Sequence, residues 1–128
     1  MSLQTPLGRV LGLGAAKDGV HHWWVQRLTS VALVPLSIWF VVSLLALPSL
    51  DHATVSAWLH QSWSALLLIL LVLTASWHSQ LGMRVVVEDY VHDAGLRTVI
   101  LALLTFAHAL LAAAAVLAVL RVALGRLS

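Results

Sequence analysis

The chain has 128 residues, of which 61% are hydrophobic and only 9% are charged, and its formal net charge is +2. Soluble globular domains carry about 25% charged residues, so this composition excludes an ordinary soluble domain. The seven Lys and Arg residues stand singly rather than in a cluster, which excludes a nucleic-acid-binding surface of the usual kind. The absence of cysteine excludes disulfides and thiolate-ligated clusters in this chain.

The first predicted element is an N-terminal segment, residues 1–23, which contains glycines and charged residues. We expect it to be irregular chain or a short interfacial helix. Residues 28–50, which follow, contain no Asp, Glu, Lys or Arg. At 1.5 Å per residue, a helix of that length spans roughly 35 Å, enough to cross a hydrocarbon core of about 30 Å. The pattern therefore predicts a membrane-spanning helix over residues 24–47, ended by Pro48.

Two later stretches, residues 61–83 and 98–120, are equally free of these four residue types. The predicted elements after the first span are a far-side loop over residues 48–60, a second span over residues 61–87, a connecting loop over residues 88–95 and a third span over residues 96–124. In hydrocarbon every backbone polar group needs a partner within the protein, and a helix supplies these partners locally. The sequence thus predicts an all-α integral membrane protein with three transmembrane helices.

The distribution of basic residues predicts the orientation of these spans. Five of the seven lie on or beside the N-terminal segment and the connecting loop: Arg9, Lys17, Arg27, Arg84 and Arg97. Because positive residues are retained on the cytoplasmic side, we expect the N-terminus there, or on the matrix side of a mitochondrial membrane. Trp23 and Trp24 at one boundary, with Trp58 and Trp63 at the other, are typical of aromatic belts.

Polar residues gather in the stretch SWHSQLGMRVVVEDYVH at the end of the second predicted span. His78 lies roughly 8 Å inside the expected membrane edge. An ionisable residue at such depth is costly and indicates function, and neutral imidazole is a common axial ligand of haem iron. Gly82, about one turn later, leaves space for a flat macrocycle. A histidine hydrogen-bonded to a neighbouring helix, with Gly82 needed for packing, is the alternative, and spacing alone does not decide between the two.

Asp89 and Tyr90 end the same stretch. Asp89 lies eleven residues after His78, on about the same face of a helix and about 16 Å away. A phenol hydroxyl donates a hydrogen bond to a quinone carbonyl, and a carboxylate orients water or relays protons. An aromatic-belt tyrosine beside a solvated carboxylate is the alternative.

The pattern H-x3-G-x6-D-Y, formed by His78, Gly82, Asp89 and Tyr90, resembles the smaller haem-bearing membrane anchor subunit of succinate dehydrogenase. The segment KDGVHHWWVQR before the first span and the three-span layout resemble the same family, in its alphaproteobacterial and mitochondrial-like branch. The resemblance extends over about residues 6–125. It implies a helix bundle shared with a larger cytochrome b anchor subunit, bound to an iron–sulfur subunit and a flavoprotein subunit, in a bacterial or mitochondrial inner membrane.

The resemblance also implies residue roles. His78 would be one axial ligand of a b-type haem, and the second histidine would come from the larger anchor subunit. His21 and Arg27 would lie near the haem propionates, although simple positive-inside flanking is an alternative for Arg27. Tyr90 and Asp89 would form part of the site that reduces ubiquinone.

The chain has no flavin, nicotinamide or iron–sulfur motif, so it is expected to act as a subunit of succinate:ubiquinone oxidoreductase rather than as a catalyst alone. One alternative is a cytochrome b-type anchor of another respiratory dehydrogenase or of fumarate reductase, with His78 and His108 as two ligands from one chain. The other is a small transporter or assembly scaffold in which His78 and Asp89 form a proton path.

Overall fold

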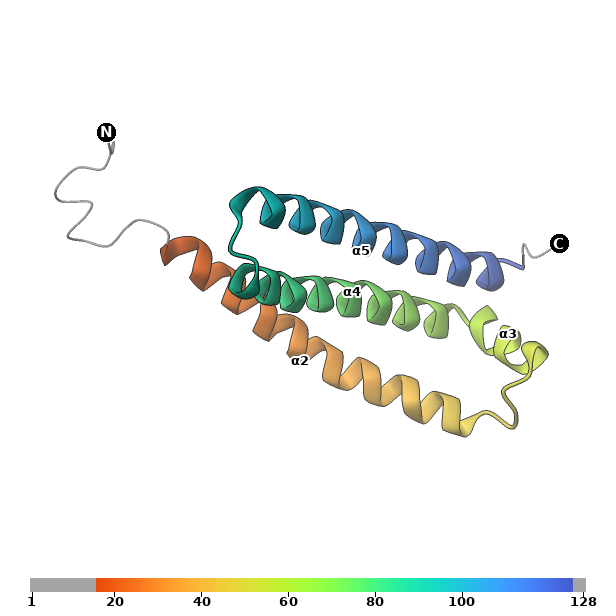
Figure 1. Cartoon of the computed structure of the whole chain (residues 1–128). Helices are drawn as coiled ribbons and strands as arrows, with labels where there is room; N and C mark the ends of the chain where they lie inside the picture. Colours follow the sequence, from red (N-terminus) through yellow and green to blue (C-terminus); the bar gives the residue numbers. More distant parts are fainter. Residues whose placement is uncertain (1–15, 126–128) are drawn as a thin grey trace, which may run out of the picture.

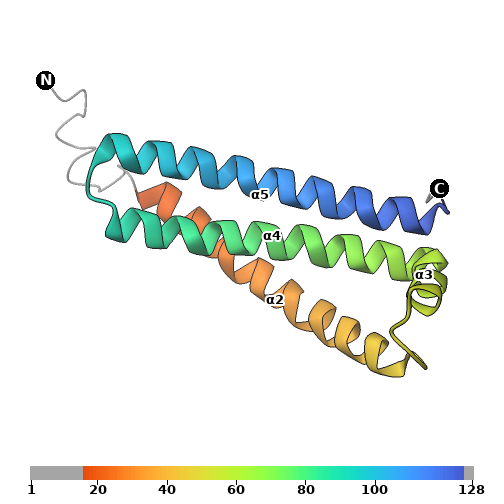
Figure 2. The ribbon, with the colours of Figure 1, turned by 45° about the vertical axis from the view of Figure 1, so that its right-hand side comes forward.

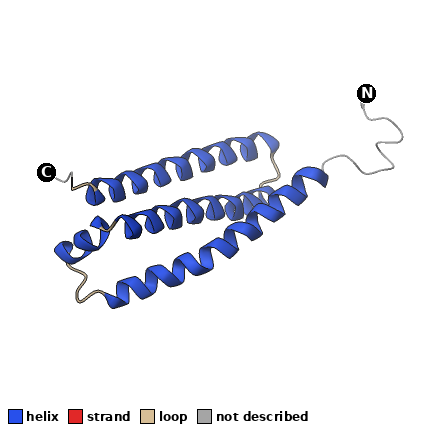
Figure 3. Cartoon of the chain, turned by 180° about the vertical axis from the view of Figure 1, so that it is seen from behind, coloured by secondary structure: helices blue, strands red, loops and turns tan. Residues whose placement is uncertain are grey.

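The computed structural model describes residues 16–125, and the side chains of all of these except residues 16–19 and 22. This range contains four helices and no strand (Figure 3). The helices are α2 (Ala16–Ala46), α3 (His52–His60), α4 (Ser62–Tyr90) and α5 (Ala94–Ala123).

Three of these helices contain segments long and apolar enough to cross a membrane: Trp23–Ala46, Ser62–Tyr90 and Ala94–Ala123. Their apolar side chains are mostly exposed on the surface of the chain rather than buried within it. This is the pattern of helices whose surroundings are lipid or other membrane helices. The predicted fold class, an all-α integral membrane protein with three spans, is confirmed.

The long helices differ in how closely they pack. Antiparallel α4 and α5 run side by side along most of their length, whereas α2 crosses α4 at an angle near the N-terminal end of α2 and then diverges from it (Figures 1 and 2). The short α3 lies at the divergent end. Within the described range, the start of α2 and the end of α5 lie at opposite ends of the bundle, as three crossings require (Figure 1).

Helix boundaries follow from local chemistry. Asp51 caps α3 by accepting a hydrogen bond from the backbone N–H of Thr54 at 2.8 Å, and Asp93 caps α5 through the N–H of Leu96 at 2.7 Å. Pro48 lies two residues beyond the end of α2. Proline has no backbone N–H to donate, so the helix does not continue through it.

Residues 48–60, predicted as a loop, instead contain the helix α3. Val55, Trp58 and Leu59 form an i, i+3, i+4 apolar stripe that accounts for it. Trp58 is buried and stacks on Trp39 of α2, with 5.8 Å between ring centroids, so its assignment to an aromatic belt was wrong. The buried apolar core, Trp58, Leu59, Ala65 and Val119, lies at this end of the bundle.

The remaining boundaries are also shifted. Residues 16–23 of the predicted N-terminal segment already belong to α2, and residues 1–15 lie outside the described residues. The helix α4 continues to Tyr90, three residues beyond the expected end of the second span. Only residues 91–93 connect it to α5. Asp89 and Tyr90 are therefore held on a helix end and not on a loop.

Candidate functional site

The crossing of α2 and α4 brings Thr29 and His78 together. Thr29 Oγ1 lies 3.0 Å from His78 Nδ1, and both residues are half-buried. The same hydroxyl lies 2.9 Å from the carbonyl oxygen of Val25 and 3.0 Å from that of Gln26, within its own helix. One ring nitrogen of His78 is thus held against α2, by a residue 49 positions earlier in the sequence.

Gln26, about one helical turn before Thr29 in α2, also lies at this crossing. Its side-chain nitrogen lies 3.8 Å from the position that a β-carbon on Gly82 would take, so the amide covers the glycine at ordinary contact distance. Its side-chain oxygen Oε1 is buried and has no hydrogen-bond partner among the described residues. A buried acceptor without a partner costs about 1–3 kcal/mol.

The second helix pair holds the other membrane histidine. His108 Nδ1 lies 2.9 Å from the carbonyl oxygen of Leu104, and Nε2 lies 3.3 Å from Ser79 Oγ. Because a carbonyl only accepts, Nδ1 donates and Nε2 accepts from the serine hydroxyl. Both nitrogens of His108 are therefore engaged within the chain, as expected of a histidine that joins two helices.

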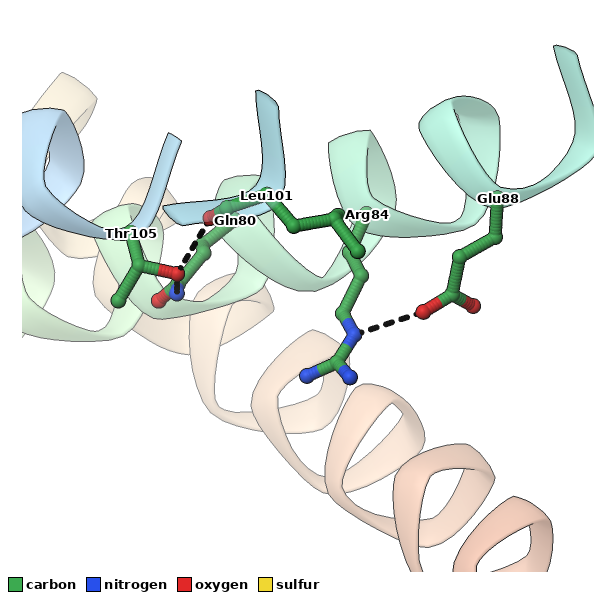
Figure 4. Close-up of polar contacts among 5 residues, drawn as sticks. All are labelled: Gln80, Arg84, Glu88, Leu101 and Thr105. Atoms are coloured by element: carbon green, nitrogen blue, oxygen red, sulfur yellow. Dashed lines mark hydrogen bonds and ion pairs between the residues drawn. The ribbon is translucent and has the colours of Figure 1, made fainter. Parts of the chain in front are cut away.

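The α4–α5 contact continues towards the connecting loop (Figure 4). Gln80 Nε2 donates to Thr105 Oγ1 at 3.0 Å, and Thr105 Oγ1 donates to the carbonyl oxygen of Leu101 at 2.9 Å. Arg84 donates through Nε to Glu88 one turn later, at 2.9 Å. An open groove of about 250 Å³ lies beside Gln80, Arg84, Thr105 and Phe106.

Asp89 and Tyr90 lie at the C-terminal end of α4 and are exposed; Tyr90 is 79% exposed. Tyr90 follows His78 by twelve residues, which corresponds to about 18 Å along the helix. The structure therefore separates them from His78 while placing them at the same end of the bundle as the start of α2 (Figure 1). Such an exposed position is open to a molecule that arrives at the membrane boundary.

Arg27 and His21 are both exposed on α2. The Arg27 guanidinium lies 5.4 Å from the ring centroid of Trp23, one turn earlier, in a cation–π arrangement. Arg27 precedes Thr29 by two residues, or about 200° of helix rotation, so it points away from the side that contacts His78. The structure does not bring Arg27 into contact with His78.

Among the described residues, no group of three or more His, Asp or Glu side chains could hold a metal ion. A metal bound by this chain through His78 would need its other ligands from elsewhere, such as a macrocycle and a second protein. His78 itself fits this use. Its Nδ1 contacts Thr29, and no hydrogen bond to Nε2 is found among the residues whose side chains the structure describes.

A family model described as "Succinate dehydrogenase/Fumarate reductase transmembrane subunit" matches residues 1–120. The chain belongs to this family. The sequence resemblance is therefore confirmed, and with it a multi-pass membrane protein.

Individual members of the succinate dehydrogenase/fumarate reductase transmembrane family are similar over most of the chain. A "Succinate dehydrogenase hydrophobic membrane anchor subunit" of Rickettsia bellii is 38% identical over 94 residues, 73% of this chain and 75% of the relative. One of Rickettsia conorii is 35% identical over 69% of this chain and 71% of the relative. One of Paracoccus denitrificans is 30% identical over 121 residues, 94% of this chain and 93% of the relative.

Two residues of this transmembrane subunit, Thr29 and Gln26, were not among the residues predicted from sequence. Threonine and glutamine are common in membrane helices, and their contacts with His78 and Gly82 depend on the angle at which α2 crosses α4. The polar pattern QRLTS just inside the first span was the one available signal.

Proposed function

We propose that this chain is a membrane anchor subunit of succinate:ubiquinone oxidoreductase. Its family membership and the similarity to relatives that carry that name support the proposal. As an anchor it takes part in the enzyme without being catalytic alone. Fumarate reductase is the second candidate, because the family description includes it.

The partners of this anchor are the larger cytochrome b anchor subunit, the iron–sulfur subunit, the flavoprotein subunit and membrane lipid. Its long helices expose large apolar side chains such as Leu45, Phe106 and Leu110, at 80%, 74% and 72%. In a membrane this surface contacts lipid or a second set of helices. Since α2 diverges from α4, the chain alone does not close a bundle (Figure 2). We place the larger anchor subunit against this open side.

We assign His78 as one axial ligand of a b-type haem shared with the larger anchor subunit. The single observation that carries this assignment is the hydrogen bond between Thr29 and His78 Nδ1, which leaves Nε2 for a metal. When bound, haem supplies a one-electron redox centre inside the membrane. His21 and Arg27 are assigned to its propionates, since a guanidinium pairs strongly with carboxylates.

We assign Tyr90 and Asp89 to the ubiquinone site. Their exposure at the end of α4 suits a substrate that diffuses within the membrane and reacts at its boundary. Reduction of a quinone to a quinol consumes two electrons and two protons. The Tyr90 hydroxyl donates a hydrogen bond to a quinone oxygen, and Asp89 supports proton delivery from the aqueous side. We propose from the distribution of basic residues that the N-terminus, the connecting loop and the soluble subunits lie on the cytoplasmic side of a bacterial inner membrane, or on the matrix side of a mitochondrial one.

Deletion of the chain in its own host tests the anchoring role. We expect succinate oxidation with an artificial dye to move from the membrane fraction to the soluble fraction, and expression of the chain to return it. Membrane-bound, quinone-linked succinate oxidation that survives the deletion would contradict the proposal. Loss of fumarate reduction alone would select the second candidate, and loss of neither activity would favour a transporter or scaffold.

A further inference from the structure

The hydrogen bond between α2 and α4 fixes where the ring proton of His78 resides. A hydroxyl carries one proton and two lone pairs. Thr29 Oγ1 lies 2.9 Å and 3.0 Å from two carbonyl oxygens of its own helix, those of Val25 and Gln26, which only accept. The threonine proton is therefore used within α2, and a lone pair is directed at His78. The Nδ1 nitrogen, 3.0 Å away, must be the donor in this pair.

A neutral imidazole with its proton on Nδ1 carries its lone pair on Nε2. His108 provides an internal comparison. It too donates through Nδ1, to the Leu104 carbonyl, but its Nε2 accepts from Ser79. Among the side chains that the structure describes, which exclude those of residues 16–19 and 22, no hydrogen bond to His78 Nε2 is found. Of the two histidines, only His78 has its lone pair free of a protein donor in the described part of the chain.

We propose that Thr29 is the positioning residue for His78: it holds the ring in the Nδ1–H form and fixes its plane so that Nε2 is presented to iron. This inference rests on the proposed haem ligation and extends it to a residue on another helix. Threonine suits the task because its β-branched side chain has restricted χ1 rotamers in a helix. A hydrogen bond to Nδ1–H also raises the basicity of the coordinating nitrogen.

The hydrogen bond acts on ligand strength more than on the stability of the bundle. A single interhelical hydrogen bond in a membrane contributes little to helix association on average, so loss of one leaves the helices assembled. By contrast, loss of a partner behind a metal ligand costs about 10- to 100-fold in metal affinity. A substitution at Thr29 should therefore separate the two effects.

Thr29→Val, which keeps the side-chain shape and removes the oxygen, tests the proposal in the purified complex. We expect the affinity of the complex for haem to fall by about 10- to 100-fold. We also expect the haem midpoint potential to rise, because a less basic ligand stabilises ferric iron less. The low-spin ferric electron paramagnetic resonance signal should also shift or broaden, since it reports the orientation of the axial imidazole planes. Thr29→Ser, which restores the oxygen, should return all three readouts towards those of the unsubstituted protein.

Thr105→Val is the matched control. Thr105 also donates to a carbonyl of its own helix and accepts from a side chain of α4, that of Gln80. This bond, however, joins α4 to α5 and does not involve α2 (Figure 4). It should leave the haem signals unchanged. Unchanged signals in Thr29→Val, or equal changes in both valine variants, would overturn the positioning role. Retention of normal haem signals in His78→Ala would instead overturn the proposed ligation, so the two failures are distinguishable.

Discussion

At the scale of single residues, the two membrane histidines show what decides a role. His78 and His108 are both half-buried, and both lie well inside apolar helices. Depth and burial therefore do not separate a ligand from a packing residue. Their hydrogen bonds differ, because His108 uses both nitrogens within the chain whereas His78 is held through Nδ1, and this difference is the basis for proposing His78 as the ligand.

Tyr90→Phe removes the phenol hydroxyl and keeps the ring. We expect quinone-linked succinate oxidation to fall by about 10- to 100-fold, because the proposed hydrogen bond to the quinone is removed and general acid–base effects are of this order or larger. Succinate oxidation with an artificial dye should stay normal, since it bypasses the quinone site. Both assays are made on the same membranes, and equal quinone activity in the two proteins would remove Tyr90 from the site.

Arg27→Ala tests the propionate assignment. A guanidinium near the haem stabilises the more negative, reduced form, so its loss should lower the midpoint potential. This shift has the opposite sign to the one expected for Thr29→Val. Arg27→Lys, which keeps the charge, should move the potential less. A redox titration that shows no difference between Arg27→Ala and the unsubstituted protein would leave Arg27 as a flanking residue that stacks on Trp23.

At the scale of helices, periodicity and charge predicted the three spans but not α3. Long runs without charged residues indicate the spans, and these runs can be read directly from the sequence. The helix α3 is nine residues long, and its signals are an Asp51 cap and the short apolar stripe of Val55, Trp58 and Leu59. The prediction for residues 48–60 was a loop, because this segment is much shorter than the uncharged runs that mark the spans.

The α3 cap gives a pH dependence. Hydrogen bonds, first from the Ser49 hydroxyl and then from the Thr54 N–H, hold the pKa of Asp51 below its usual value of 3.8. Because the folded-state pKa is the lower one, the stabilisation is present above pH 3.8 and is lost as pH falls through the folded-state pKa. A carboxyl-carbon NMR titration of Asp51 should have a midpoint below 3.8. A midpoint at or above this value, or one unaffected by Ser49→Ala, would contradict the capping geometry.

The contact between α2 and α4 could not be predicted from the periodicity of the sequence. His78, Asp89 and Tyr90 could be selected from sequence because they are unusual residues at informative depths. Thr29 could not, since its role depends on a crossing angle that joins residues 49 positions apart. The same holds for the buried Oε1 of Gln26, whose lack of a partner among the described residues is visible only once α4 is in place.

At the scale of the whole molecule, the chain is an incomplete bundle. Within the described residues only four apolar side chains are buried, all of them at the α3 end: Trp58, Leu59, Ala65 and Val119. Elsewhere the helices expose their apolar surfaces, and α2 stands away from α4 over much of its length (Figure 1). Association in a membrane depends on close packing and polar contacts between helices. A chain of this shape is expected to reach its full packing against other subunits of its complex.

The most direct test of the account is the reduced-minus-oxidised optical spectrum of the purified complex, with His78→Ala and His108→Ala compared side by side. We predict a b-type band in the unsubstituted complex that is lost or shifted by His78→Ala and retained by His108→Ala. A band that survives His78→Ala, or one removed by His108→Ala instead, would contradict the claim that this anchor presents His78 to haem.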